Sequence, residues 1–109
     1  MVKKSNALPI LWDEEAKLAL KEIIQFIAKD SPAGATHVKK TLLKLSRTLG
    51  RFPNKFKEEP LLEDLVGNYR SVSKWNWKIV YEVTNSEVII LQILDTRQDP
   101  SKLKSKFKK

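Results

Sequence analysis

The sequence predicts an α+β domain in which a hairpin of two helices packs on a small antiparallel sheet, in the order β-α-α-β-β-β. Apolar residues recur at helical spacing through the first half of the chain. In the second half they alternate with polar residues or form an unbroken run, as strands do. Because a pair of amphipathic helices must bury its apolar stripes, we expect the helices to cover one face of the sheet.

The first strand is expected at residues 8–12 (LPILW). Asp13 follows it and is expected to cap a helix that begins with Glu14 and Glu15, because acidic side chains suit the positive end of a helix dipole. This helix is predicted to run to about Lys29. Its buried stripe consists of Ala16, Leu20, Ile23, Ile24 and Ile27.

The short motif DSP, residues 30–32, separates the first helix from the second. Ser31 suits the N-cap of the second helix, and Pro32 suits its first helical position. Gly50 is expected to end this helix. The apolar stripe consists of Val38, Leu42, Leu45 and Leu49.

A second row on the same helix is basic, and it consists of Lys40, Lys44, Arg47 and Arg51. It runs two positions out of phase with the apolar stripe. Since two residues turn a helix by about 200°, the basic row is predicted to lie opposite the buried face. Two interpretations stay open: a solvated outer face, or a surface for nucleic acid or for an acidic protein.

Three strands are expected after an acidic linker. The first is NYRSV, residues 68–72. In WNWKIVYEV, residues 75–83, every second residue from Trp75 to Val83 is apolar, which predicts one buried face that includes both tryptophans. A turn at 84–86 leads to EVIILQIL, residues 87–94, which is apolar on both faces and therefore predicted to be central. A short helix is expected at about 101–107.

Length and composition indicate a single domain, residues 1–109, with a basic tail at about 102–109. The absence of cysteine excludes disulfides and thiolate metal sites, and it suits a reducing cytosol. No apolar run approaches the roughly 20 residues that a membrane span needs, so a cytoplasmic protein without membrane contact is predicted.

The net charge of +8 comes largely from lysines at the two ends of the chain. Charge is also segregated within the body, because residues 31–57 hold seven cations and no acid, whereas residues 58–64 hold four acids. An anionic or acidic partner is therefore expected.

The chain from Ile10 to Leu103 resembles the RelE/ParE superfamily of bacterial type II toxins. The resemblance rests on the order and spacing of ILWDEEAKLALKEIIQFI, DSP, FP, YR, WKIVYEV and ILDTRQDP. It implies a compact toxin that a co-expressed acidic antitoxin, disordered when free, holds inactive. No metal and no cofactor is expected. The superfamily has two kinds of target, and the resemblance implies either one.

RelE-like members cut messenger RNA on the ribosome, a reaction that needs a proton acceptor, cations on the phosphate and a proton donor. By resemblance, Arg70, Lys78 and Arg97 fall on the basic positions of this branch, and Lys74 is a looser match. Residues 98–109 contain no tyrosine or histidine, which RelE-like nucleases usually carry there. The acid/base set is therefore incomplete, and the chain is an enzyme only under this alternative.

ParE-like members bind DNA gyrase and trap cleaved DNA, which requires a surface but no catalytic group. The ending TRQDP is closer to this branch, so gyrase poisoning is the favoured function. The residues expected to form a surface for the target or for nucleic acid are Lys40, Lys44, Arg47, Arg51 and Arg97. Arg97 has two interpretations: it pairs locally with Asp95 and Asp99 to fix a bend before Pro100, or it is presented to a partner.

Overall fold

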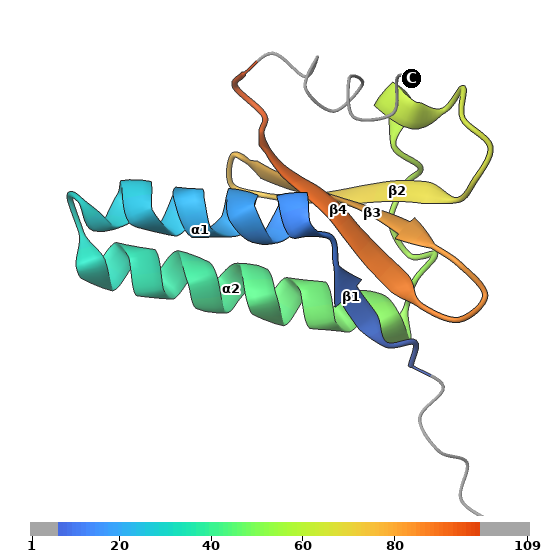
Figure 1. Cartoon of the computed structure of the whole chain (residues 1–109), viewed down its shortest axis with the longest axis horizontal. Helices are drawn as coiled ribbons and strands as arrows, with labels where there is room; N and C mark the ends of the chain where they lie inside the picture. The colour runs from blue at the N-terminus through green and yellow to red at the C-terminus, as the bar shows by residue number, and fades with distance from the viewer. Residues whose placement is uncertain (1–6, 99–109) are drawn as a thin grey trace, which may run out of the picture.

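The computed structural model describes residues 7–98, and its elements follow the predicted order (Figure 1). They are β1 (Ile10–Trp12), α1 (Glu14–Ala28), α2 (Pro32–Arg51), the short 3-10 helix η1 (Pro60–Leu62), β2 (Tyr69–Lys74), β3 (Trp77–Val83) and β4 (Val88–Asp95). The predicted α+β fold is confirmed. The helix expected at about 101–107 and the basic tail lie outside the described residues.

The four strands form one sheet in the order β1-β4-β3-β2, so β4 is central, as its apolar faces predicted. Strands β2, β3 and β4 pair antiparallel. The three antiparallel strands are therefore confirmed, and β1 completes a mixed sheet by pairing parallel with β4, from Ile10 opposite Val88 to Trp12 opposite Ile90. Periodicity shows which faces of a strand are buried, but it does not reveal the strand's direction or its neighbour.

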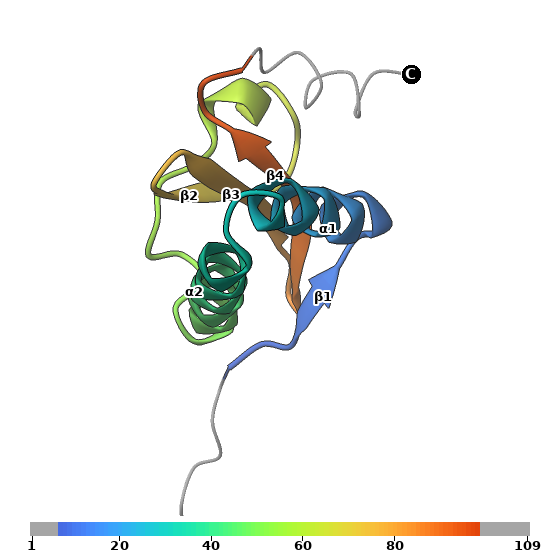
Figure 2. The ribbon, with the colours of Figure 1, turned by 90° about the vertical axis from the view of Figure 1, so that its left-hand side faces the viewer.

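The core lies between the helices and one face of the sheet (Figures 1 and 2). Its fully buried side chains include Leu42 and Leu49 of α2, which belong to one cluster with Ile79 and Tyr81 of β3. Full burial of an aliphatic or aromatic side chain stabilises the fold by about 1.5–3 kcal/mol. The α-hairpin therefore covers one face of the sheet, as expected.

A smaller apolar cluster covers the other face, where Leu62 of η1 packs on Val80 of β3. The expectation that residues 75–83 bury only one face is therefore wrong. Three successive residues of β3, from Ile79 to Tyr81, are fully buried because they alternate between two covered faces.

A β-bulge keeps β4 in register with the core. Ile90 and Ile93 are an odd number of residues apart, which in a regular strand would place them on opposite faces. Both nevertheless pack in the cluster beneath the helices. The strand pairing shifts by one residue between Val80 and Tyr81, so β4 accommodates an extra residue and both isoleucines face the same way.

The beginnings of the two helices differ from each other. Ser31 caps α2 as predicted, because its Oγ accepts a hydrogen bond from the backbone N–H of Gly34 at 2.9 Å. Asp13 holds the N-cap position of α1, but its side chain does not form the predicted capping bond. Its backbone N–H instead donates to the carbonyl oxygen of Ile90 at 2.9 Å and extends the β1–β4 ladder.

The predicted β3 strand starts two residues too early. Lys74 pairs with Trp77, so Trp75 and Asn76 form the two-residue turn of the β2–β3 hairpin. Trp75 has φ 56°, and its side chain is 51% exposed, so the expectation that it belongs to the core is wrong. Trp77 does pack against the core.

Gly50 does not end α2, which continues to Arg51. It is needed for a close approach, because the backbone N–H of Leu8 donates to its carbonyl oxygen at 2.9 Å. A Cβ at position 50 would collide with the carbonyl oxygen of Leu8. The glycine therefore lets the segment that leads into β1 lie directly on the helix.

We expect Gly50→Ala to destabilise the protein by about 1–3 kcal/mol, because the added methyl group must displace the backbone at Leu8. In an ordinary helix interior the same change stabilises by up to about 1 kcal/mol, so the sign of the effect is diagnostic. Urea unfolding followed by circular dichroism measures it. An increase in stability would contradict the close approach.

Candidate functional site

The cations that the resemblance assigns to RNA cleavage do not meet on one sheet face. Arg70 lies opposite Tyr81 in the β2–β3 register, so it shares the helix-facing side of the sheet. Lys78 is three residues from Tyr81 on β3 and therefore lies on the other side. The sheet separates Arg70 from Lys78.

Arg70 holds the segment before η1 against β2. Its Nη1 donates to the carbonyl oxygen of Phe56 at 2.6 Å, and its Nε donates to Oδ1 of Asn68 at 2.9 Å. The guanidinium thus adds side-chain hydrogen bonds to a segment that also pairs with β2 through its backbone, from Glu59 N–H to the Tyr69 carbonyl oxygen and from Ser71 N–H to the Lys57 carbonyl oxygen. Burial raises the pKa of the nearby Tyr81 hydroxyl to about 12, although the charge of Arg70 partly opposes this shift.

Lys78 is paired inside the fold with Glu59. Its Nζ lies 2.9 Å from Oε1 of Glu59, whose side chain is completely buried. The other oxygen, Oε2, accepts the backbone N–H of Leu61 at 2.8 Å and so caps η1. Burial alone would raise the pKa of Glu59, but hydrogen bonds from Lys78, Ser71 and Leu61 outweigh it, and the pKa lies below its ordinary value.

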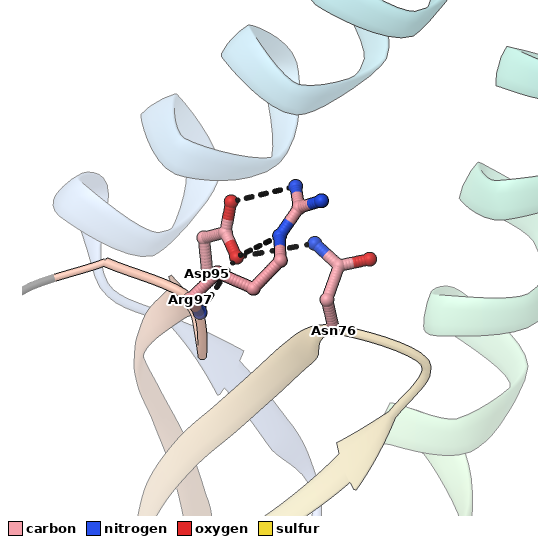
Figure 3. Close-up of polar contacts among 3 residues, drawn as sticks. All are labelled: Asn76, Asp95 and Arg97. Atoms are coloured by element: carbon pink, nitrogen blue, oxygen red, sulfur yellow. Dashed lines mark hydrogen bonds and ion pairs between the residues drawn. The ribbon is translucent and has the colours of Figure 1, made fainter.

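Arg97 makes a two-pronged contact with Asp95 at the end of β4 (Figure 3). Its Nε and Nη2 donate to the two carboxylate oxygens at 3.1 Å each. Asp95 Oδ1 also accepts the backbone N–H of Arg97 at 3.0 Å and Nδ2 of Asn76 at 3.2 Å. Hydrogen bonds from the Arg97 side chain and backbone hold the pKa of Asp95 well below its usual range.

This arrangement serves both interpretations of Arg97. Asp95 ties the end of β4 to the β2–β3 turn, which is a structural role. The Arg97 side chain nevertheless stays 70% exposed, so Asp95 fixes a cation that faces solvent. Asp99 and Pro100, which were expected to complete the bend, lie outside the described residues.

A groove of about 790 Å³ runs along α1 and around the last residues of β4. Lys78 and Arg97 both line it, so the structure brings these two predicted residues to one groove and leaves Arg70 elsewhere. Two large apolar side chains of α1 also line the groove while remaining exposed, Leu18 at 54% and Phe26 at 67%.

The floor of the groove is an open sheet edge. β1 ends at Trp12, opposite Ile90, and among residues 7–98 no strand pairs with β4 beyond that point on this side. The backbone N–H of Ile93 donates to the side-chain Oε1 of its neighbour Gln92 at 3.1 Å. A side chain thus occupies a donor that a further strand would take.

The basic row of α2 lies on the outer face of the helix. Lys40, Lys44, Arg47 and Arg51 are all exposed. Within the described part of the chain, none of the four forms an ion pair. Buried Leu42, Ser46 and Leu49 lie on the opposite side of the helix.

Lys74, the weaker candidate for the RNA-cleavage site, lies over the ring of Trp75, with Nζ 5.2 Å from its centroid.

Sequence reasoning missed Glu59 because it lies among four acids that resemble a solvated linker. The one available signal is Pro60 directly after it. An acid before proline fits the cap of a short helix, which is the role that Glu59 performs.

Within residues 7–98 there is no group of three or more histidine, aspartate or glutamate side chains placed to hold a metal ion. Neither helix in that range combines the length and apolar character of a membrane span.

Comparison with known proteins identifies the family. The family described as "ParE toxin of type II toxin-antitoxin system, parDE" matches residues 10–100. The chain therefore belongs to the ParE toxin family of type II toxin–antitoxin systems. The fold is similar to a solved chain of the chromosomal ParDE toxin–antitoxin system from P. aeruginosa, with TM-score 0.64 and 20% identity over 82% of this chain and 96% of that one.

A second solved structure, TrmO from P. aeruginosa, reaches only TM-score 0.49 and 13% identity, over 85% of this chain and 35% of that one. This likeness is too weak to bear on function. A search of curated proteins found no match.

We expect Lys78→Met to destabilise the protein by about 3–5 kcal/mol, because it leaves the Glu59 carboxylate buried without its counter-charge. The double variant Lys78→Met with Glu59→Gln should recover most of this loss, since the glutamine can still accept the N–H of Leu61. Urea unfolding of the two single variants and the double variant measures the coupling. Additive losses would show that the pair is not coupled.

Proposed function

We propose that this protein is a cytoplasmic toxin that arrests growth by binding DNA gyrase and trapping cleaved DNA. Membership of the ParE family supports the toxin assignment. The observation that favours binding over catalysis is that each of the three candidate cations already contacts a partner within the protein. Arg70 holds a loop, Lys78 is paired with buried Glu59, and Arg97 is fixed by Asp95. A gyrase poison needs no acid/base set, only an exposed surface.

The alternative function is metal-independent cleavage of messenger RNA on the ribosome. One observation favours it: Lys78 and Arg97 line the same groove, where they would be available to a phosphate. The groove also holds the carboxylates of Glu59 and Asp95, which would repel an RNA strand. For this reason we place gyrase first.

We expect the purified full-length protein to accumulate linear DNA when it is incubated with gyrase and supercoiled plasmid and then quenched with detergent and protease. Arg97→Ala should reduce the linear product by about tenfold or more, the usual effect of losing a central interface arginine. Its melting temperature should change little, because the Arg97–Asp95 contact is on the surface. Lys17→Ala, which removes an exposed cation of α1, is the matched control.

Folded protein that arrests growth without producing linear DNA would transfer the assignment to the ribonuclease. Cleavage of messenger RNA on purified ribosomes, lost in Arg97→Ala, would then establish that alternative.

We further propose that the antitoxin fills the groove beside α1 and adds a strand to the open edge of β4. An exposed sheet edge next to exposed apolar side chains suits this mode of recognition. The groove is lined by four acids (Glu15, Glu22, Glu59 and Asp95) and by Lys78 and Arg97. The entering segment should therefore be mainly apolar, while acidic parts of the antitoxin complement the net charge of +8 elsewhere.

We expect Phe26→Glu to weaken binding of the antitoxin by tenfold or more, about 1.4 kcal/mol, because it places a charge in an apolar contact. Isothermal titration with the acidic protein encoded beside this toxin measures the affinity. Phe52→Glu is the matched control, since Phe52 is similarly exposed, at 55%, but lies at the end of α2 outside the groove. Stronger weakening by Phe52→Glu than by Phe26→Glu would exclude the groove.

A further inference from the structure

One side of α2 carries more than the four cations of the basic row. His37 lies one helical turn before Lys40, on the same side, so residues 37, 40, 44, 47 and 51 form a continuous line. At a rise of about 1.5 Å per residue this line is about 21 Å long. All five side chains are exposed, and residues 31–57 contain no acid that would neutralise the row.

The β2–β3 turn adds an aromatic ring to the amino-terminal end of this line. The rings of Trp75 and His37 lie 5.7 Å apart between centroids, tilted by 53°. Lys74, the last residue of β2, places its Nζ 5.2 Å from the Trp75 centroid. The other two tryptophans, Trp12 and Trp77, pack against the core. Trp75 is the most exposed of the three tryptophans.

The backbone at Trp75 is in a conformation that a bulky residue rarely adopts. Its φ of 56° falls in the left-handed region, where two-residue hairpin turns normally place glycine, asparagine or aspartate. Such strained residues persist where the surroundings hold them, and they cluster at functional sites. No core contact explains why a half-exposed tryptophan occupies a turn that glycine would fit better.

This surface is separate from the groove. The groove is lined by residues of α1, η1, β3 and β4 and by the segment after β4, and none of the α2 row or the Trp75 turn contributes to it. A protein segment in the groove would therefore leave the surface accessible. The surface includes Lys40, Lys44, Arg47, Arg51, His37 and Trp75, and we call it the basic–aromatic face.

We propose that the basic–aromatic face binds a single strand of nucleic acid, with phosphates along the cations of α2 and an unpaired base stacked on Trp75. A row of point charges next to an exposed aromatic ring is the usual construction of single-strand binding sites. An acidic protein would be expected to require a wider apolar centre, and the large exposed apolar residues of α1 lie in the groove instead. This site does not overlap the groove proposed for the antitoxin.

The test is fluorescence anisotropy of a labelled oligothymidine strand with the purified full-length protein at several salt concentrations. Four phosphate contacts predict a slope of about −2.8 for log K against log salt, which weakens binding about 50-fold between about 50 and 200 mM salt. Lys44→Gln with Arg47→Gln should reduce that slope in magnitude by about 1.4. Lys21→Gln with Lys29→Gln removes the same charge from the other helix of the hairpin and should leave the slope unchanged.

A second readout follows Trp75 directly. Stacking on a base should quench tryptophan fluorescence in the wild-type protein, and Trp75→Gly should abolish the quenching and weaken binding by about tenfold. Glycine suits the φ of this turn, so the variant is expected to fold.

Three results would overturn the proposal. Equal effects of the two double variants would show that binding follows net charge alone. Unchanged quenching in Trp75→Gly would remove the ring from the site. Binding of poly-glutamate in place of the oligonucleotide would make this a surface for acidic protein.

Discussion

The short parallel pairing of β1 with β4 determines where the edge of β4 is covered and where it stays open. It spans three residues and is extended by the hydrogen bond from Asp13 N–H to the Ile90 carbonyl. Because α1 begins immediately after Asp13, the chain leaves the sheet at that point and cannot cover the remainder of β4. The open edge of β4 and the groove beside α1 both follow from where β1 stops.

The two cations on the sheet, Arg70 and Lys78, form contacts that stabilise the fold. Arg70 bonds the carbonyl of Phe56 and holds a loop, and Lys78 compensates Glu59, which itself caps η1. These contacts place the second apolar cluster, in which Leu62 covers Val80. Of Arg70, Lys78 and Arg97, the last alone directs most of its side chain to solvent, and Asp95 fixes its position. Because Arg70 and Lys78 are engaged within the fold, they are less available for catalysis, which supports the proposal that the protein acts by binding.

The α-hairpin separates two kinds of surface. α1 contributes exposed apolar residues and acidic neighbours to the groove, whereas α2 presents cations and no acid. The two helices lie side by side (Figure 2), yet the groove is lined by residues of α1 and by none of the α2 row. The two proposed sites, one for a protein segment and one for a polyanion, therefore lie on different helices of the same domain.

Periodicity and capping residues determined the order of elements, both helices, the Ser31 cap and the central position of β4, because these features depend on local spacing. Tertiary structure decided what depends on contacts between distant residues. Leu8 approaches Gly50, which explains a glycine that looked like a helix stop. In the sequence Glu59 differs from its acidic neighbours only by the proline that follows it, and the fold alone places Lys78 against it.

Which candidate side chains share a face of the sheet depends on the register between β2 and β3 more than on residue type. The two-residue turn at Trp75 and Asn76 fixes how β2 pairs with β3 and therefore places Arg70 and Lys78 on opposite faces. A shift of one residue would have reversed the face of either side chain, and no composition or motif reveals that shift. The sequence by itself determined which cations this protein carries, and the pairing of its strands decided which of them can meet.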